Sequence, residues 1–248
     1  MGAKQMLYIS MYVKGVILLL ALSVITAHRI FSQKWFSQIA TPAQIQEEIN
    51  QRKYDINGYN MEGLTPLMYA ITLSDIDRVK MLIAAGADVN LKDRGALNNT
   101  ALHMVGLKGN LKNAVPIMEL LLNAGADPKI RNRQGGTPVH YLWYSNFLDG
   151  RNAMLKMLLE HGVDINAQDD KGKTFIHQMV DRNDSLWYDQ VLLAYGGIIN
   201  LAIKDNNGRN AYEYADFIGK YGMKNRILAT MEIMKEKQLP LMQGQLQP

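Results

Sequence analysis

The sequence predicts an all-α solenoid in which short helix–turn–helix units stack side by side. The main observation is a four-residue phrase that returns at nearly constant spacing. Its copies are Thr65-Pro66-Leu67-Met68, Thr100-Ala101-Leu102-His103, Thr137-Pro138-Val139-His140, Thr174-Phe175-Ile176-His177 and a degenerate Asn210-Ala211-Tyr212-Glu213. The steps between their first residues are 35, 37, 37 and 36, so each copy marks one repeated unit.

A second phrase interleaves with the first and predicts where the second helix of each unit ends. Its copies are Gly86-Ala87-Asp88-Val89-Asn90, Gly125-Ala126-Asp127-Pro128 and Gly162-Val163-Asp164-Ile165-Asn166. Each follows an apolar helical stretch, and glycine readily adopts the left-handed backbone that stops a helix. We expect Gly196 to stop the second helix of the fourth unit in the same way.

The residues of the first phrase suit a helix start that faces a core. Threonine caps a helix N-terminus, and proline fits the first turn, where its missing N–H is not needed. The apolar residues at the third position should point into the stack; they are Leu67, Leu102, Val139 and Ile176. Because one unit buries only one face, neighbouring units have to stack to complete the core.

Together the two phrases resemble the ankyrin repeat, which has a period of about 33 residues and a T-P-L-H-x-A signature. The resemblance covers about residues 41–235 and implies four to five repeats plus terminal caps. Within a domain spanning 41–237, the expected repeats are 58–92, 93–130, 131–168, 169–204 and 205–237. The third repeat departs from the pattern through an enlarged loop at Asn146–Asn152.

Helices are expected to cover both ends of the stack. One should begin at Thr41-Pro42 and run to about Gln51. The other should be Met223–Lys237, and its inner face is predicted to carry Ile227, Leu228, Met231 and Met234. Residues 238–248 are expected to form a disordered tail.

Residues 1–28 have the pattern of a membrane anchor or a signal peptide. Val16–Ala27 holds twelve uncharged residues, and the longer stretch 6–27 includes Lys14. A full membrane span needs about 20 apolar residues. A signal anchor, a cleaved signal peptide and a buried helix of the folded domain are therefore all open. Residues 29–40 would be a juxtamembrane linker or helix.

The charges around this segment predict its orientation. Two lysines and the N-terminal amine precede it, whereas Arg29 and Lys34 follow it. This balance favours an N-terminus inside and repeats outside. The sequence holds no cysteine, which excludes a lipid-modified anchor and disulfides. We expect a protein in a bacterial inner membrane with periplasmic repeats, or a secreted or periplasmic protein after cleavage.

The charge distribution argues against a nucleic-acid partner. The chain carries 27 Lys and Arg residues and 23 Asp and Glu residues. Residues 1–40 contain four of the basic residues and none of the acidic ones, so residues 41–248 are balanced. A neutral repeat domain is a poor match for a phosphate backbone.

The sequence also offers no catalytic constellation. It lacks a G-x-S-x-G elbow, an H-E-x-x-H helix and a phosphate-binding loop, so we predict a non-enzyme without cofactor or small-molecule substrate. His103, His140 and His177 lie 37 residues apart. Their repeated position implies, from the resemblance, a histidine that hydrogen-bonds turn backbone, and we expect no metal there.

Candidate partner-binding residues come from positions that the repeat pattern leaves variable. The resemblance places the residues four, seven and eight after each Thr along a concave groove, and the charged turns beside it. The predicted set is Tyr69, Met104, Lys108, Arg131, Arg133, Tyr141, Trp143, Tyr144, Gln178, Asp181, Arg182 and Tyr214. Tyr, Trp and Arg are enriched among residues that dominate binding energy, so the prediction is centred on Tyr141 and Tyr144.

These features predict a non-enzymatic protein-binding module, tethered at a membrane through residues 6–27, that grips a partner protein in its concave groove. Similarity to small envelope-anchored bacterial ankyrin proteins implies a specific version, an immunity protein that neutralises a secreted toxin or enzyme. Two alternatives are an injected host-directed ankyrin effector and a stabilising partner of a periplasmic enzyme.

Overall fold

The computed structural model describes residues 43–44, 47, 50–51, 55–107, 112–144 and 148–236, with the side chains of 143, 144, 148 and 149 excepted. The predicted membrane segment, the linker 29–40, Lys108 and the tail 238–248 lie outside these residues. Ala43, Gln44, Glu47 and Asn50 are helical, within the expected first cap. No helix of the described ranges is long and apolar enough to cross a bilayer.

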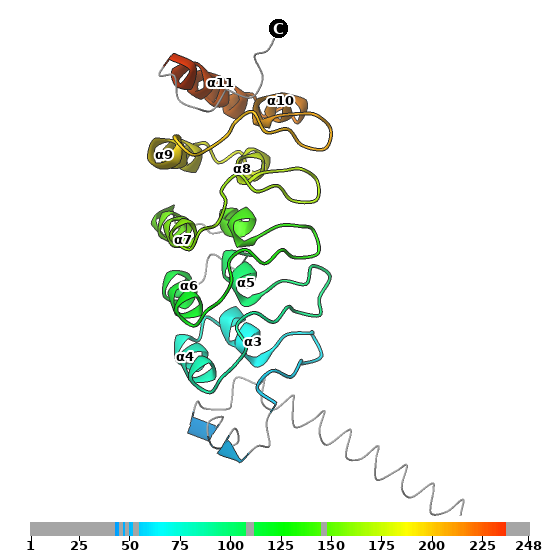
Figure 1. The fold of residues 1–248 in the computed structure, drawn as a ribbon, viewed down its shortest axis with the longest axis vertical. Helices are drawn as coiled ribbons and strands as arrows, with labels where there is room; N and C mark the ends of the chain where they lie inside the picture. The colour runs from blue at the N-terminus through cyan, green and yellow to red at the C-terminus, as the bar shows by residue number, and fades with distance from the viewer. Residues whose placement is uncertain are drawn as a thin grey trace, which may run out of the picture.

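Paired helices form two parallel columns, and long loops project from one side of the stack (Figure 1). The first column contains α3 (Pro66–Thr72), α5 (Ala101–Leu107), the 3-10 helix η1 (Pro138–Tyr144), α8 (Phe175–Arg182) and α10 (Ala211–Phe217). The second column contains α4 (Ile76–Ala84), α6 (Ala114–Asn123), α7 (Leu148–Glu160), α9 (Ser185–Tyr195) and α11 (Tyr221–Glu236). This arrangement confirms the predicted all-α repeat solenoid.

The recurring threonine phrase builds the first helix of each unit as expected. Thr65 accepts a hydrogen bond from the Met68 N–H at its Oγ1, and Pro66 occupies the first turn of α3. The apolar third positions are all buried in one continuous core, namely Leu67, Leu102, Val139 and Ile176. The core therefore runs continuously from one unit to the next.

The glycine that ends the second helix is confirmed in three units and wrong in the fourth. Gly86, Gly125 and Gly162 have φ values of 89°, 86° and 74°. Gly196 has a φ of −54°, which is right-handed. A Cβ at Gly196 would lie 2.5 Å from the Leu192 carbonyl oxygen and 3.2 Å from the Met234 Cε. Glycine therefore serves close packing against α11 at this position.

The predicted enlarged loop Asn146–Asn152 is wrong from Leu148 onward, because α7 begins there, and its first two residues lie outside the described ranges. Two residues assigned to the loop anchor the helix to the next repeat. The Arg151 guanidinium pairs with Asp184 and lies 4.4 Å from the centre of the Trp187 ring. Asn152 accepts a hydrogen bond of 2.8 Å from the Trp187 indole N–H. These contacts favour an early helix start.

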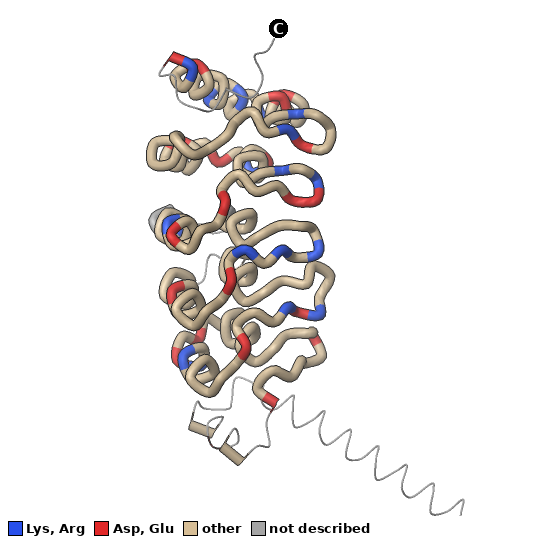
Figure 2. The backbone as a smooth tube through the Cα atoms, in the orientation of Figure 1, with Lys and Arg blue, Asp and Glu red and all other residues tan. Residues whose placement is uncertain are grey.

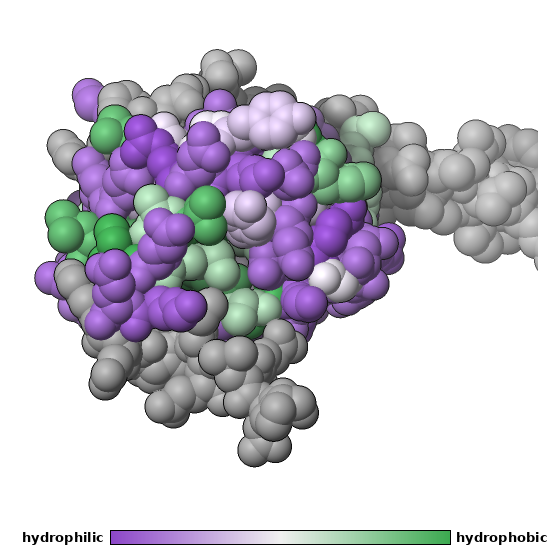
Figure 3. Space-filling model, turned by 90° about the horizontal axis from the view of Figure 1, so that it is seen from above, coloured by the Kyte–Doolittle hydropathy of each residue, from purple (hydrophilic) through white to green (hydrophobic). Residues whose placement is uncertain are grey.

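The closing helix α11 covers the last unit with a slightly different face from the predicted one. Met223, Ile227 and Met234 are buried, and Met231 is half-buried. Leu228 is 40% exposed, so its predicted inward position is wrong. Seen from this end, the surface mixes apolar and hydrophilic residues (Figure 3).

The loops that precede each first helix, here called fingers, are joined to one another by backbone hydrogen bonds. The second to fifth fingers are residues 91–99, 128–136, 165–173 and 201–209. Each donates one N–H to the finger before it: Arg94 to Gly63, Arg133 to Leu97, Asp170 to Gln134 and Asn206 to Lys171, at 2.8 to 3.0 Å. Gly135, with a φ of 70°, permits the close approach of Asp170.

We predict that Gly135→Ala destabilises the domain more than Gly86→Ala. Both residues have positive φ, which costs an alanine about 1 to 2 kcal/mol. An added Cβ at Gly86 meets open space, whereas at Gly135 it lies 2.0 Å from an Asp170 carboxylate oxygen. Urea unfolding of both variants checks this difference. Equal losses would show that the contact between the third and fourth fingers yields without cost.

Candidate functional site

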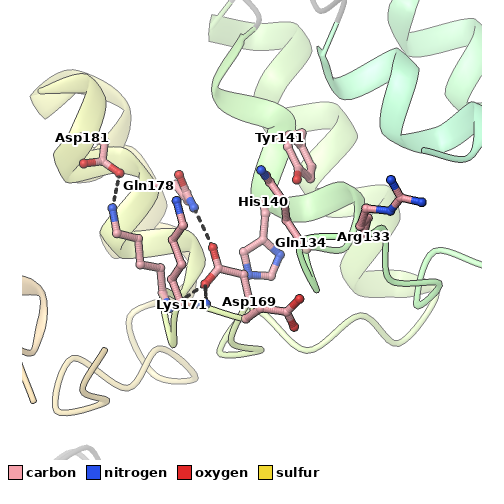
Figure 4. Close-up of a pocket in the computed structure, with 11 residues that line it drawn as sticks. Arg133, Gln134, His140, Tyr141, Asp169, Lys171, Gln178 and Asp181 are labelled. Atoms are coloured by element: carbon pink, nitrogen blue, oxygen red, sulfur yellow. Dashed lines mark hydrogen bonds and ion pairs between the residues drawn. The ribbon is translucent and has the colours of Figure 1, made fainter. Parts of the chain in front are cut away.

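A groove of about 350 Å³ lies between the third and fourth fingers, beside η1 and α8. Figure 4 shows its side chains entering from both repeats, with the third finger on one side and the fourth on the other. Its lining includes Arg133, Gln134, Tyr141, Lys171, Gln178 and Asp181. Four of these six belong to the predicted set, so the fold brings residues 48 positions apart into one site.

Asp169 organises the fourth finger at the edge of this groove. Its Oδ1 accepts hydrogen bonds from the N–H groups of Lys171 and Lys173, each at 2.9 Å. Its Oδ2 accepts a hydrogen bond from the Gln178 side-chain amide at 3.2 Å. The carboxylate is thus committed to the local turn and holds Gln178 in place.

A second polar cluster joins the groove to the fifth repeat. The Lys173 ammonium lies 2.8 Å from Asp181 Oδ2, and it also donates to the Tyr214 hydroxyl oxygen. The Tyr214 hydroxyl donates in turn to Asp181 Oδ1. Burial alone would lower the pKa of Lys173, but the hydrogen bonds to Asp181 and Tyr214 raise it above its usual value. The cluster therefore keeps a charged lysine and a protonated tyrosine together.

The three histidines at equivalent positions connect neighbouring repeats. Each Nδ1 lies 3.1 to 3.2 Å from the N–H of the threonine that begins its own helix. Each Nε2 faces a carbonyl oxygen further along the chain: His103 to Gly136 at 3.0 Å, His140 to Ala167 at 3.0 Å and His177 to Arg209 at 3.2 Å. This pattern requires a neutral imidazole that accepts at Nδ1 and donates at Nε2.

Burial lowers the pKa of all three imidazoles, to about 4 in His103. Hydrogen bonds to carbonyl groups raise the pKa of each imidazole but oppose the effect of burial only in part. In the part of the chain that the structure describes, no three His, Cys, Asp or Glu side chains gather as a metal site would require. The histidines act as links between repeats.

The family model for the ankyrin repeat matches residues 62–94, 97–133 and 134–170. Together with the stacked helix pairs and their fingers, this match decides the fold. The described chain is an ankyrin-repeat solenoid. Ankyrin repeats imply a protein–protein interaction module.

Curated relatives share the ankyrin repeats. The chain is 35% identical over 133 residues to the nuclear factor NF-kappa-B p105 subunit of Gallus gallus, which is 52% of this chain and 12% of that protein. It is 30% identical over 161 residues to the putative ankyrin repeat protein L86 of Acanthamoeba polyphaga mimivirus, or 56% and 27% of the two chains. It is 30% identical over 153 residues to human inversin, or 62% and 13%. The chain thus spans at most 27% of these three relatives.

Several predicted groove residues are more buried than their sequence position implied. Met104, Tyr141 and Tyr214 are 6%, 8% and 6% exposed. The rings of Tyr141 and Tyr214 lie against His103 and His177 of the preceding repeat, with centroids 5.7 Å and 5.8 Å apart. The Tyr141 hydroxyl also accepts a hydrogen bond of 2.7 Å from the Asn132 amide. These side chains help to join ankyrin repeats, and their part in partner binding stays a prediction.

The remaining predicted residues fall into three groups. Arg133 and Arg182 are exposed, whereas Tyr69, Gln178 and Asp181 are half-buried. Trp143 and Tyr144 belong to η1, but their side chains lie outside the described part, as does Lys108. Arg131 is exposed, yet its guanidinium donates to the Gln168 carbonyl oxygen of the next finger.

Sequence reasoning missed the wider pattern to which Arg131 belongs. Lys92 donates to the Arg131 carbonyl oxygen at 2.8 Å, and the Gln168 side chain donates to the Lys204 carbonyl oxygen at 2.9 Å. Long polar side chains thus cross from each finger to the next. Their repeat-length spacing in the sequence is the signal that could have identified them.

We predict that the free energy of unfolding decreases as the pH falls from 6.5 towards 4. A lowered pKa in the folded state means that the unfolded chain binds protons first, so stability is complete above pH 6.5 and is lost below it. For His103, a pKa of about 4 instead of 6.5 corresponds to a loss on the order of 3 kcal/mol.

Urea unfolding at several pH values measures this slope. His103→Gln should flatten it between pH 6.5 and 5, where few carboxylates titrate. His161→Gln is the matched control, because His161 is exposed and makes its hydrogen bond within its own helix end. An unchanged slope in His103→Gln would contradict the assignment of a buried neutral imidazole.

Proposed function

We propose that this chain is a membrane-tethered, non-enzymatic protein that holds a partner protein in the groove between its third and fourth fingers. The observation that carries the proposal is the convergence of Arg133, Gln178 and Asp181 on one cavity of about 350 Å³. The sequence alone marked Gln178 and Asp181 as positions that the repeat pattern leaves free, and Arg133 as a charged turn residue. Variable residues that meet in a hollow of a repeat scaffold are typical of a recognition site.

The groove is built before any partner arrives. Asp169 holds Gln178, and the cluster of Lys173, Asp181 and Tyr214 fixes the far wall. A preformed site loses little conformational entropy on binding, which favours affinity. The Arg133 and Lys171 side chains at its rim are exposed, so their positive charges are accessible to an approaching partner protein.

The size and polarity of the groove favour a protein partner over a small metabolite. Pockets for small molecules have volumes of about 300 to 1,000 Å³ and are mostly apolar. This one is near the lower limit and is lined by charged and amide side chains from both repeats. Such a hollow accommodates one inserted side chain of a larger surface.

The finer version of the proposal is an immunity protein that neutralises a secreted toxin or enzyme from an envelope membrane. Its support is the apolar segment 6–27 ahead of the repeats and the resemblance to small envelope-anchored ankyrin proteins. A host-directed effector and a stabilising partner of a periplasmic enzyme are the alternatives, and the identity of the captured protein separates them. A toxin that loses activity on binding supports neutralisation, whereas an enzyme that gains stability contradicts it.

Two uncharged substitutions test the groove. Full-length chain carrying Gln134→Ala with Gln178→Ala should capture its partner from source-cell extract at least tenfold less than the unmodified chain. Lys80→Ala with Lys156→Ala is the control pair, since both lysines are exposed on the helices α4 and α7. Tyr141 is unsuitable here, because its truncation would also weaken the stack. Equal capture by all three proteins would refute the groove as the binding site.

Membrane fractionation tests the tether. The full chain should stay with membranes in high salt and at alkaline pH. Leu19→Arg with Leu20→Arg should release it, because each charge at a helix centre costs about 2.5 to 3.5 kcal/mol on insertion. Gln33→Arg with Ser37→Arg, outside the apolar segment, should leave it bound. Release of the unmodified chain by salt alone would show that no segment spans the bilayer.

A further inference from the structure

The neutral balance of residues 41–248 conceals a strong separation of charge. The second to fifth fingers contain nine Lys or Arg residues and four Asp residues. The rest of that range holds 14 basic and 19 acidic residues. Basic residues accordingly mark the projecting loops in Figure 2. The finger edge is therefore basic and the remainder of the domain acidic.

Burial increases this separation of charge, because most carboxylates of the fingers form bonds within their own loops. Asp93 is 6% exposed and accepts the Gly95 N–H at 2.9 Å. Asp205 is 5% exposed and forms an ion pair of 2.9 Å with Arg209. Asp169 is committed to its turn, as described above. Within these four fully described fingers, Asp170 is the exposed acidic residue.

Seven of the nine cations in these fingers are exposed. The exposed ones are Lys92, Arg94, Lys129, Arg131, Arg133, Lys171 and Lys204. Lys92 and Arg131 are held by contacts to the following finger, so the edge is preorganised. The Arg94 guanidinium lies 4.0 Å from the centre of the Tyr59 ring, which fixes a third cation.

The backbone hydrogen bonds between successive fingers align one row of side chains. Arg94, Arg133, Asp170 and Asn206 each donate their N–H to the preceding finger, so they occupy equivalent positions. Charge along this row is positive, positive, negative and then neutral. A row with a reversal of sign distinguishes partners by their charge pattern as well as by their total charge.

We propose that the second to fifth fingers dock an acidic segment of the partner protein, with its carboxylates over Arg94 and Arg133 and a neutral or basic residue over Asp170. This inference rests on the proposed function and names the chemistry of its partner. A nucleic acid carries one phosphate at every step and would meet Asp170 with like charge. A protein segment can match the reversal of sign, which favours it as the occupant.

Binding of a defined probe tests the edge. The probe is a fluorescent oligo-glutamate peptide of 12 residues, added to the full chain in detergent and followed by anisotropy. Exposed ion pairs are weak singly and screened by salt, so affinity should fall about tenfold between 50 and 200 mM NaCl. Asp170→Asn should tighten binding about twofold, because it removes a like charge from the row.

Matched charge variants locate the effect. Arg94→Gln with Arg133→Gln should weaken peptide binding about fivefold, and Lys80→Gln with Lys156→Gln, which removes the same net charge elsewhere, less than twofold. Lys129→Gln with Lys171→Gln is a second finger pair, in case the first pair lowers the melting temperature. Equal losses in the finger and control pairs would overturn the proposal.

Two further results show whether the acidic segment, the charged edge or the groove is wrong. Tighter binding of a 12-nucleotide single strand or of phosphatidylserine vesicles than of the peptide, unchanged by Asp170→Asn, would assign the edge to phosphate and refute the acidic segment. If the variant Arg94→Gln with Arg133→Gln still captures the partner but Gln134→Ala with Gln178→Ala does not, the charged edge is refuted and the groove is not. Capture that survives both pairs would refute the proposed groove itself.

Discussion

The histidine bond that joins the second, third and fourth repeats to the finger that follows each of them is the interaction on which the rest of this structure depends. A buried backbone N–H or carbonyl has to find a partner, and one imidazole supplies a partner for both. His103 accepts from the Thr100 N–H and faces the Gly136 carbonyl oxygen, so it fixes its own helix start and the end of the following finger. Only the neutral ring can do both, which is why burial and a lowered pKa accompany this position.

This link also explains why the tyrosines are less open than the groove positions implied. The rings of Tyr141 and Tyr214, each from the following repeat, pack against the imidazole rings of His103 and His177. The groove is then the space left between the third and fourth fingers, walled by shorter polar side chains. In the proposed function, Gln134, Gln178 and the charged rim contact the partner, while the aromatic rings pack between the repeats.

The fingers show how a fold can separate charges that the composition balances. A tight turn needs acceptors for its exposed N–H groups, and Asp93, Asp169 and Asp205 provide them from within their own loops. Lysines and arginines have long stems and cannot serve as acceptors, so they extend outward or reach across to the next finger. The requirements of the turns therefore leave a basic edge, which is the feature that the proposed acidic segment would contact.

The sequence by itself determined the repeated elements of the scaffold. The threonine phrase, the stop glycines Gly86, Gly125 and Gly162, and the histidines obey constraints that each unit imposes again, so their period reveals the fold and their roles. Tertiary structure decided the departures from the pattern: the close packing at Gly196, the helical start at Leu148, the outward side of Leu228 and the burial of Tyr141. Three of them depend on one neighbour each: Gly196 on Met234, the start of α7 on Trp187 and Tyr141 on His103. No local pattern records the position of such a neighbour, because packing is set by the shape of the adjoining repeat.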